Sequence, residues 1–216
     1  MPFTTGILIG IGETRAERID SMLALRQLHV AFGHIQEIII QNFRPKPNTR
    51  MEQVPPASLP ELLWTIAVAR LLFGPEMSIQ APPNLSPGEL TQLVAAGVND
   101  WGGVSPVTPD HVNPEAPWPH LDTLRSETEA AGKTLVERLA VYPDFIRNKK
   151  RWLSSHFHTP IIRAVDSDGF ARTESWSAGA PVDPPAPMIA FVDTAKGGPD
   201  DRLLGGILNR ALSVVA

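Results

Sequence analysis

The sequence predicts an α/β protein built on a parallel β-sheet. A unit of apolar strand, loop and capped helix occurs four times, at a spacing of roughly 30 to 45 residues. The first two strand candidates are near-continuous apolar runs, as expected of strands covered on both faces. Many of the 22 prolines and 16 glycines fall just past apolar runs, where turns belong. Four such units are half of an eight-fold barrel, and an open doubly wound sheet is the alternative.

The first unit is the segment 6–14, GILIGIGET, which predicts a buried strand running straight into a helix. Its glycines allow other groups to approach the backbone closely. Thr14 and Glu17 have the spacing of a capping box, and the helix extends to about Phe32, with Gly33 past its end. The carboxyl end of such a strand is where parallel α/β proteins place their sites.

The second and third units follow the same plan. Residues 35–41 predict a second buried strand that ends in a proline-stiffened loop. Ser58 and Glu61 predict another capping box, for a helix that reaches about Phe73. Residues 77–81 predict the third strand.

The third helix is predicted to begin at Ser86-Pro87, with Glu89 in its first turn, and to stop at Gly97. Residues 98–104 predict a short fourth strand, and a fourth helix follows Pro119 and ends at Gly132. The pattern then changes. The remaining predictions are an extended segment at 134–142, short helices at 143–153 and 160–165, a linker at 173–187 rich in Ser, Gly and Pro, and a terminal helix at 203–215.

Composition excludes several classes of protein. With 19 basic and 23 acidic residues the net charge is −4, so no nucleic-acid footprint is expected. No apolar run reaches the length of about 18 residues that a membrane span needs. The first residues have neither the basic region nor the cleavage site of a signal peptide, which predicts a cytoplasmic protein. The chain has no cysteine, so disulfides and thiolate metal sites are excluded.

The pattern Gly6-x-Leu8-x-Gly10-x-x-Glu13 resembles the GxIxGxxE motif on the fifth barrel strand of radical S-adenosylmethionine (SAM) enzymes, with Leu8 where isoleucine is usual. The resemblance covers about residues 2–172 and is to the ring-closing module of the deazaflavin-forming branch of that family. Four further segments carry it in the right order: QNFRPKPNT (41–49), SIQAPPNLSPGEL (78–90), NDWGGVSPVTPDHVNPEAPWP (99–119) and GKTLVERLAVYP (132–143).

The resemblance implies a barrel enzyme in which a [4Fe–4S] cluster cleaves SAM to a 5′-deoxyadenosyl radical. That radical abstracts hydrogen from a tyrosine–ribitylaminouracil adduct, which cyclises and loses ammonia, so the enzyme is a carbon–nitrogen lyase. Residues 1–172 are then half of the barrel with its carboxyl-terminal extension, and 173–216 are a linker and a terminal helix leading toward a second radical SAM module.

One departure from the family is equally concrete. The family binds its cluster through a CxxxCxxC loop after the first barrel strand, and this chain has no cysteine. The chain therefore resembles the second half of a truncated barrel, and Met1 is interpreted as an internal residue or a misplaced start. Alone, it is predicted to bind no cluster and to be inactive. The first and last strands of a half-barrel are open edges, so a missing amino-terminal half is the expected partner.

The resemblance implies SAM contacts for Gly10, Ile11, Gly12 and Glu13. From the local pattern alone, a strand with glycines in a packed barrel is the simpler interpretation. A dinucleotide fingerprint fails, because Arg15 stands where its last glycine belongs.

Polar residues and glycines at the other strand ends are candidates for binding the substrate or SAM. The alternative is that these side chains only cap loops, and that the glycines only permit a tight turn. The candidates are Gln41, Asn42, Arg44, Gln80, Asn84, Gly103 and Ser105.

Two other groups of residues are predicted to have ordinary surface roles. His156 and His158 are more simply a surface pair than metal ligands, because no third ligand is evident nearby. The basic run 147–151 is more simply a solvated helix face than a phosphate site. No metal site is therefore predicted.

Two alternatives remain open. The first is another radical SAM family, such as the futalosine-pathway or biotin synthase enzymes, against which the APPN (81–84) and WGGVSP (101–106) segments argue. The second is an inactive remnant that only binds a partner half.

Overall fold

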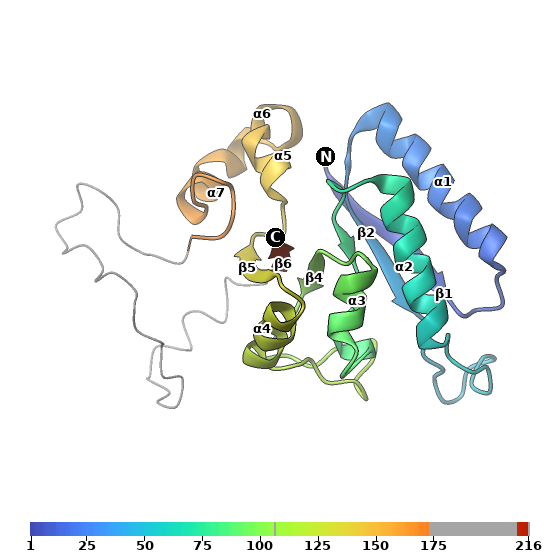
Figure 1. Cartoon of the computed structure of the whole chain (residues 1–216). Helices are drawn as coiled ribbons and strands as arrows, with labels where there is room; N and C mark the ends of the chain where they lie inside the picture. The colour runs from blue at the N-terminus through green and yellow to red at the C-terminus, as the bar shows by residue number, and fades with distance from the viewer. Residues whose placement is uncertain (106, 173–210, 216) are drawn as a thin grey trace.

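The computed structural model describes residues 1–105, 107–172 and 211–215. Its centre is a six-stranded sheet in the order β1-β2-β3-β4-β6-β5, in which β1 to β4 run parallel and β6 runs antiparallel between β4 and β5 (Figure 1). The strands are β1 (Phe3–Ile9), β2 (Ile35–Asn42), β3 (Ile79–Gln80), β4 (Asp100–Gly103), β5 (Thr134–Arg138) and β6 (Ala211–Val215).

Four helices follow the four parallel strands and cover one face of the sheet, each packed against the next (Figure 1). Sequential strand order with all helices on one face distinguishes this sheet from a doubly wound one, which has helices on both. Three short helices lie beyond the amino ends of the strands. The helices are α1 (Arg15–Phe32), α2 (Leu59–Phe73), α3 (Leu90–Ala96), α4 (Leu121–Ala130), α5 (Pro143–Arg147), α6 (Lys149–Trp152) and α7 (His158–Ala164), with 3₁₀ turns at Pro83–Leu85 and Ser155–Phe157.

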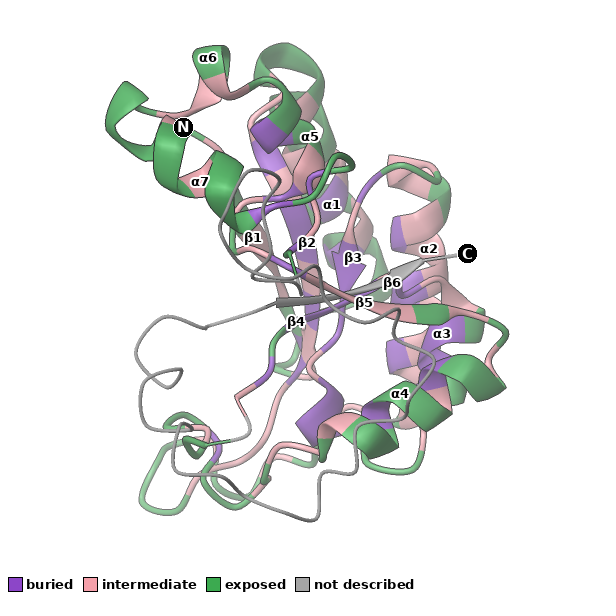
Figure 2. Ribbon diagram, turned by 90° about the vertical axis from the view of Figure 1, so that its left-hand side faces the viewer, coloured by how far each residue is buried: buried purple, intermediate pink, exposed green. Residues whose placement is uncertain are grey.

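The hydrophobic core lies between the sheet and α1 to α4 (Figure 2). Ile38 and Ile40 of β2, Ile79 of β3 and Trp101 of β4 are fully buried there. Because side chains alternate along a strand, their neighbours point to the opposite face, which we call the inner face. By this alternation the inner face carries Gly6, Leu8, Glu37, Ile39, Gln41, Gln80, Asp100 and Gly102.

The prediction for β1 was partly wrong. The strand ends at Ile9, so residues 10–13 form a loop before α1. Leu8 is 41% exposed and Ile11 45% exposed, although both were expected to be buried. The exposure of Leu8 shows that the inner face of β1 is uncovered at this position. Among the described residues β1 pairs only with β2.

The helix signals had mixed outcomes. The Thr14–Glu17 capping box and the left-handed Gly33 at the end of α1 are confirmed. Ser58 makes no side-chain capping hydrogen bond, and the Glu61 carboxylate, expected to complete the capping box, pairs with arginines of α1. The helix expected at Ser86 begins at Leu90, since Gly88 has a φ of +81° and residues 86–89 form a turn.

One prediction for the carboxyl-terminal residues was wrong. Residues 211–215 form strand β6, whereas a helix was predicted over 203–215. Pairing with both β4 and β5 satisfies the strand's backbone, and a short apolar run does not distinguish helix from strand. β6 also covers the edge of β4 that was expected to be open. Residues 203–210 and the linker predicted at 173–187 lie outside the described residues.

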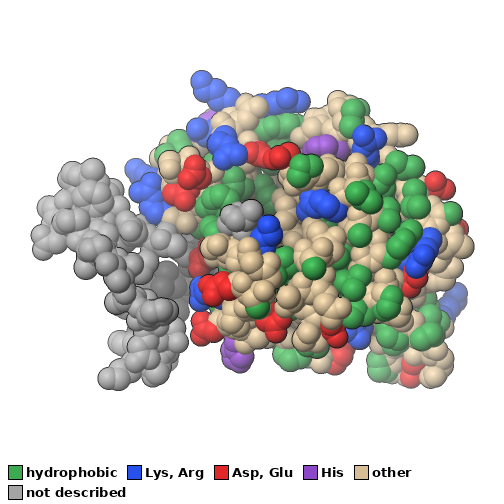
Figure 3. Space-filling view, in the orientation of Figure 1, with side chains coloured by type: hydrophobic (Ala, Val, Ile, Leu, Met, Phe, Trp, Pro, Cys, Tyr) green, Lys and Arg blue, Asp and Glu red, His purple; other side chains and the backbone are tan. Residues whose placement is uncertain are grey.

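Charges on the helix-covered face are mixed in sign, with acidic and basic side chains interspersed (Figure 3). In the described part of the chain, no helix combines the length and the apolar character needed to cross a membrane.

Candidate functional site

The candidate site lies at the carboxyl ends of β1 to β4, where parallel α/β proteins bind their ligands. Four loops meet this end of the sheet: residues 10–14, 43–58, 81–89 and 104–120, the third containing the 3₁₀ turn. Figure 1 shows them below the strands, opposite α5 to α7.

The loop after β1 is held by the carboxylate of Glu13. Its oxygens accept hydrogen bonds from the backbone N–H groups of Gly10 and Ile11, each at 2.8 Å, and from Arg18 Nε at 2.7 Å. Arg18 is 7% exposed and also donates to Glu61 Oε2 (2.8 Å) and Thr65 Oγ1 (3.1 Å). The carboxylate thus binds its own loop, and the backbone of that loop is the surface left for a ligand.

The electrostatics of Glu13 agree with this role. Burial alone would raise the pKa of the carboxyl group, but the loop N–H groups and Arg18 outweigh burial and lower it. The glycines of the loop differ in their surroundings. Gly10 has a φ of +92° and packs against Ala57, whereas Gly12 has a φ of +106° and nothing within 4 Å of a Cβ built there.

We expect Glu13→Gln to destabilise the protein by about 1 to 2 kcal/mol at neutral pH, because the amide N–H₂ cannot accept from the loop. The pKa of Glu13 is lowered in the folded protein. Its contribution to the free energy of unfolding is therefore present above pH 4.5 and is lost as pH falls through the folded pKa. Urea unfolding of the wild type and of Glu13→Gln from pH 7 to pH 3 checks that the difference between their free energies of unfolding shrinks in acid. Glu17→Gln is the matched control, since glutamine preserves a capping box; equal losses in both variants would contradict the assignment.

Side chains at the end of β2 and in the loop that follows it converge on the turn after β3. Asn42 Nδ2 donates to the Leu85 carbonyl at 3.3 Å, and Arg44 Nη2 donates to the same oxygen. Lys46 donates to Asn113 Oδ1 at 2.9 Å and pairs with Glu115. The second loop is therefore fixed to the third and the fourth.

Asp110 joins the third and fourth loops. Its carboxylate accepts from Asn84 Nδ2 at 2.9 Å, from Asn113 Nδ2 at 3.1 Å and from the Val112 N–H at 2.8 Å. Burial would raise its pKa, but these hydrogen bonds outweigh burial and lower it. Asn84 also donates to the Ala116 carbonyl at 3.0 Å.

Three candidates have a buried polar atom without a hydrogen-bond partner in the described structure. These atoms are Arg44 Nε, Gln80 Oε1 and Asn84 Oδ1. Gln80 and Asn84 are 7% and 4% exposed. A buried acceptor or donor without a partner is costly, so these three atoms are candidates for hydrogen bonds to a ligand at this end of the sheet.

The other candidates are less constrained. Gln41 is half-buried and pairs with Leu8 in the sheet. Gly103 is exposed and has open space around it. Ser105 Oγ accepts from the backbone N–H and the hydroxyl of Thr108, at 3.2 Å and 2.7 Å, within its own turn.

Sequence reasoning missed a buried ionic cluster on the inner face, made of Glu37, Asp100, Arg138 and Tyr142. Arg138 Nε and Nη2 donate to the two oxygens of Asp100, both at 2.7 Å. The Tyr142 hydroxyl accepts from Arg138 at 2.5 Å and donates to Glu37 at 2.6 Å. Burial raises the pKa of Glu37 and of Tyr142. The sequence did carry a signal for this cluster: each of three predicted extended segments contains one of its charged residues, Glu37, Asp100 and Arg138.

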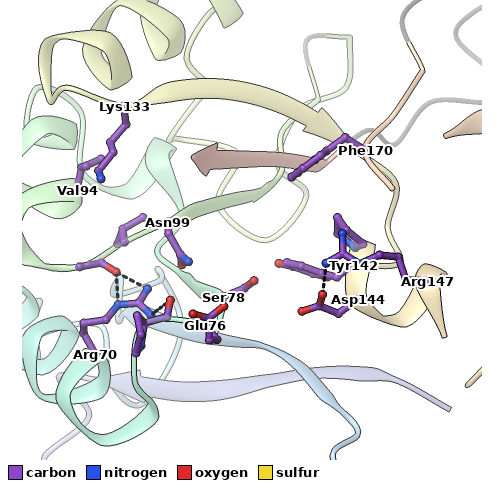
Figure 4. A pocket seen from close by; sticks show the side chains of 14 residues that line it. Arg70, Glu76, Ser78, Val94, Asn99, Lys133, Tyr142, Asp144, Arg147 and Phe170 are labelled. Carbon is purple, nitrogen blue, oxygen red and sulfur yellow. Dashed lines mark hydrogen bonds and ion pairs between the residues drawn. The ribbon is translucent and has the colours of Figure 1, made fainter. Parts of the chain in front are cut away.

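A cavity of about 650 Å³ lies at the opposite, amino end of the strands (Figure 4). Two of the three cationic side chains that line it, Arg70 and Arg147, are already engaged, and Lys133 is the third. Arg70 donates to the carbonyls of Gly97, Gly74 and Met77 at 2.7 to 3.0 Å, while Arg147 pairs with Asp144. We therefore place the site at the carboxyl end. Among the described residues there is also no group of three or more His, Cys, Asp or Glu side chains arranged for a metal ion.

Comparison with curated proteins supports the resemblance. The chain is 52% identical over 183 residues to the FO synthase of Nocardia farcinica and 52% identical over 174 residues to that of Mycobacterium tuberculosis (strain ATCC 25618 / H37Rv). It is 49% identical over 174 residues to the 7,8-didemethyl-8-hydroxy-5-deazariboflavin synthase of Methanopyrus kandleri. No family model matches the chain.

These matches cover 80 to 84% of this chain. They cover 20 to 21% of the two FO synthases and 51% of the Methanopyrus protein, so the chain spans only part of the relatives it matches. The resemblance to the deazaflavin-forming branch, and to a segment of it, is confirmed.

Proposed function

We propose that this chain is the carboxyl-terminal half of a radical SAM barrel that carries out the ring-closing, ammonia-releasing step of 7,8-didemethyl-8-hydroxy-5-deazariboflavin (FO) synthesis. The observation that carries the proposal is the 49% identity to a synthase of which the chain spans 51%. The fold agrees with it in part: four parallel strands run in sequential order with their helices on one face, as in half of a barrel, and β6 occupies the edge of β4 through which a barrel would close.

The loop 10–13 is the proposed SAM site. Gly10, Ile11, Gly12 and Glu13 come directly after the first strand, and the Glu13 carboxylate fixes the backbone of the loop. The open space beside Gly12 permits a flat group such as adenine to approach the backbone, so the residues present fit SAM. When bound, SAM supplies the radical chemistry, and the residues of this chain position and shield it.

The chain does not fit the [4Fe–4S] cluster, because it has no cysteine. We therefore propose that the cluster belongs to the missing amino-terminal half-barrel and that this chain alone is inactive. β1 is an edge strand that pairs only with β2 among the described strands, and its free edge is where that half would pair.

The substrate, a tyrosine–ribitylaminouracil adduct, is proposed to lie across the ends of β2 to β4. The uracil and ribityl groups carry many hydrogen-bond donors and acceptors, which suit the side chains gathered there. Those residues bind and orient the adduct while it cyclises: Gln41, Asn42, Arg44, Gln80, Asn84, Gly103 and Ser105. We further propose a cytoplasmic enzyme, with residues 173–216 connecting to a second radical SAM module.

Reconstitution tests the proposal. This chain is co-expressed with the amino-terminal half-barrel of the Methanopyrus relative and purified without oxygen. With a reductant and the tyrosine–ribitylaminouracil adduct supplied, we expect iron–sulfur absorbance, SAM cleavage to 5′-deoxyadenosine and formation of the fluorescent deazaflavin, with none of these from the chain alone. Gly10→Ala, which crowds Ala57 at a φ of +92°, is expected to lower SAM cleavage at least tenfold.

The alternatives give different results in the same experiment. SAM cleavage without deazaflavin would indicate another radical SAM family. A complex that forms but neither binds iron nor cleaves SAM would indicate an inactive, partner-binding half. Either result contradicts the proposal.

A further inference from the structure

We propose that Gln80 is a specificity residue whose amide oxygen accepts a hydrogen bond from an N–H or O–H group of the substrate, and that Asp100 and Arg138 position it through Gly102. This inference rests on the proposed function, because it names the chemical group that the site recognises.

The first step is the orientation of Gln80. Its neighbour Ile79 is fully buried in the core, so Gln80 lies on the inner face, between Ile39 of β2 and Asp100 of β4 in the sheet register. Its Nε2 donates to the Trp101 carbonyl at 3.3 Å. A rotated amide would place oxygen against oxygen there, so this hydrogen bond determines which way Oε1 points.

The second step is the surface on which the amide rests. A Cβ built on Gly102 would overlap the amide of Gln80, so only glycine allows this close contact. Gly102 also has a φ of +70°, and its N–H donates to Asp100 Oδ1 at 2.7 Å. The position of Gly102, and with it that of the Gln80 amide, depends on Asp100.

The third step is the support of Asp100. Its two oxygens accept from Arg138 at 2.7 Å each, and the Arg138 guanidinium lies 3.6 Å from the centre of the Tyr142 ring. Asp100 and Arg138 are 0% and 2% exposed. A two-pronged, fully buried ion pair has one geometry, so it fixes the backbone at Gly102.

The result is an acceptor that is held in place and has no donor. Gln80 Oε1 is buried and unpartnered among the described residues. A group that is prearranged in this way favours a ligand that supplies an N–H or O–H and disfavours one that does not. The uracil N–H and the ribityl hydroxyls are such donors.

The experiment uses the reconstituted assembly, with separate KM values for substrate and for SAM. Gln80→Leu keeps the approximate volume and removes the acceptor, so we expect the substrate KM to rise roughly tenfold while the SAM KM stays within about twofold. Gly102→Ala displaces the amide and is expected to shift the substrate KM in the same direction. Gln92→Leu, on the exposed side of α3, is the matched control and is expected to change neither value.

Equilibrium dialysis of ribitylaminouracil against the same assemblies measures binding without turnover. We expect weaker binding to a folded Gln80→Leu assembly than to the wild-type assembly. If this difference is found but the wild-type assembly forms no deazaflavin, only the proposed function is refuted. Equal binding and equal KM values in folded Gln80→Leu would refute this inference alone. A parallel rise in the KM values for substrate and for SAM would show a structural role for Gln80 and would also refute the inference. If the wild-type assembly does not bind ribitylaminouracil, both the inference and the proposed function are refuted.

Discussion

Asp100→Ala is expected to destabilise the protein by about 3 to 5 kcal/mol, because it leaves the Arg138 guanidinium buried without its carboxylate. Asp100 is 0% exposed, and Arg138 is 2% exposed and donates to both of its oxygens. Tyr142 and Glu37 compensate only in part, since the Glu37 carboxylate lies 3.6 Å from Arg138 Nη2 and already accepts from Tyr142.

Chemical unfolding followed by circular dichroism measures this loss. Asp122→Ala is the matched control: it removes an Asp–Arg pair whose side chains are 77% and 49% exposed, and we expect little change. The double variant Asp100→Leu/Arg138→Met removes both charges and is expected to be milder than Asp100→Ala. A loss from Asp100→Ala no larger than that from Asp122→Ala would show that the pair is not buried in solution.

The helices could be predicted from sequence because their signals are local. Thr14, Glu17 and Gly33 act within one turn of the helix they cap, so α1 was placed correctly. The capping box predicted at Ser58 is incomplete for a non-local reason: the Glu61 carboxylate pairs with Arg15 and Arg18 of another helix. Local patterns do not show which tertiary partner a carboxylate takes.

The position of the site could be predicted from the sequence, but the contacts within it could not. Strand ends predicted the group that contains Asn42, Arg44 and Asn84, and the structure brings these side chains to one turn. The direction of the Glu13 carboxylate, back onto its own loop, could not be predicted, because Arg18 reaches it only once the loop has turned. The ion pair of Asp100 and Arg138 joins residues 38 positions apart, so it depends on the sheet register.

Gly6→Ala is expected to destabilise the protein by about 3 kcal/mol, because overpacking against backbone cannot be relieved by a side-chain rotation. Gly6 pairs with Ile39 in the sheet, and a Cβ at Gly6 would overlap the carbonyl oxygen of Ile39. The added methyl group must therefore push β1 away from β2.

That displacement separates β1 from its only neighbour among the described strands, and β1 leads directly into the loop 10–13. Gly6→Ala is thus expected to weaken SAM binding to the reconstituted barrel as well as to lower stability. Gly103→Ala is the control for stability, since a Cβ there meets nothing within 4 Å and its φ is not positive. Urea unfolding of both variants, and SAM titration of Gly6→Ala against the wild type, measure the two effects. If Gly6→Ala were as stable as Gly103→Ala, β1 and β2 would not pack as closely as this register requires.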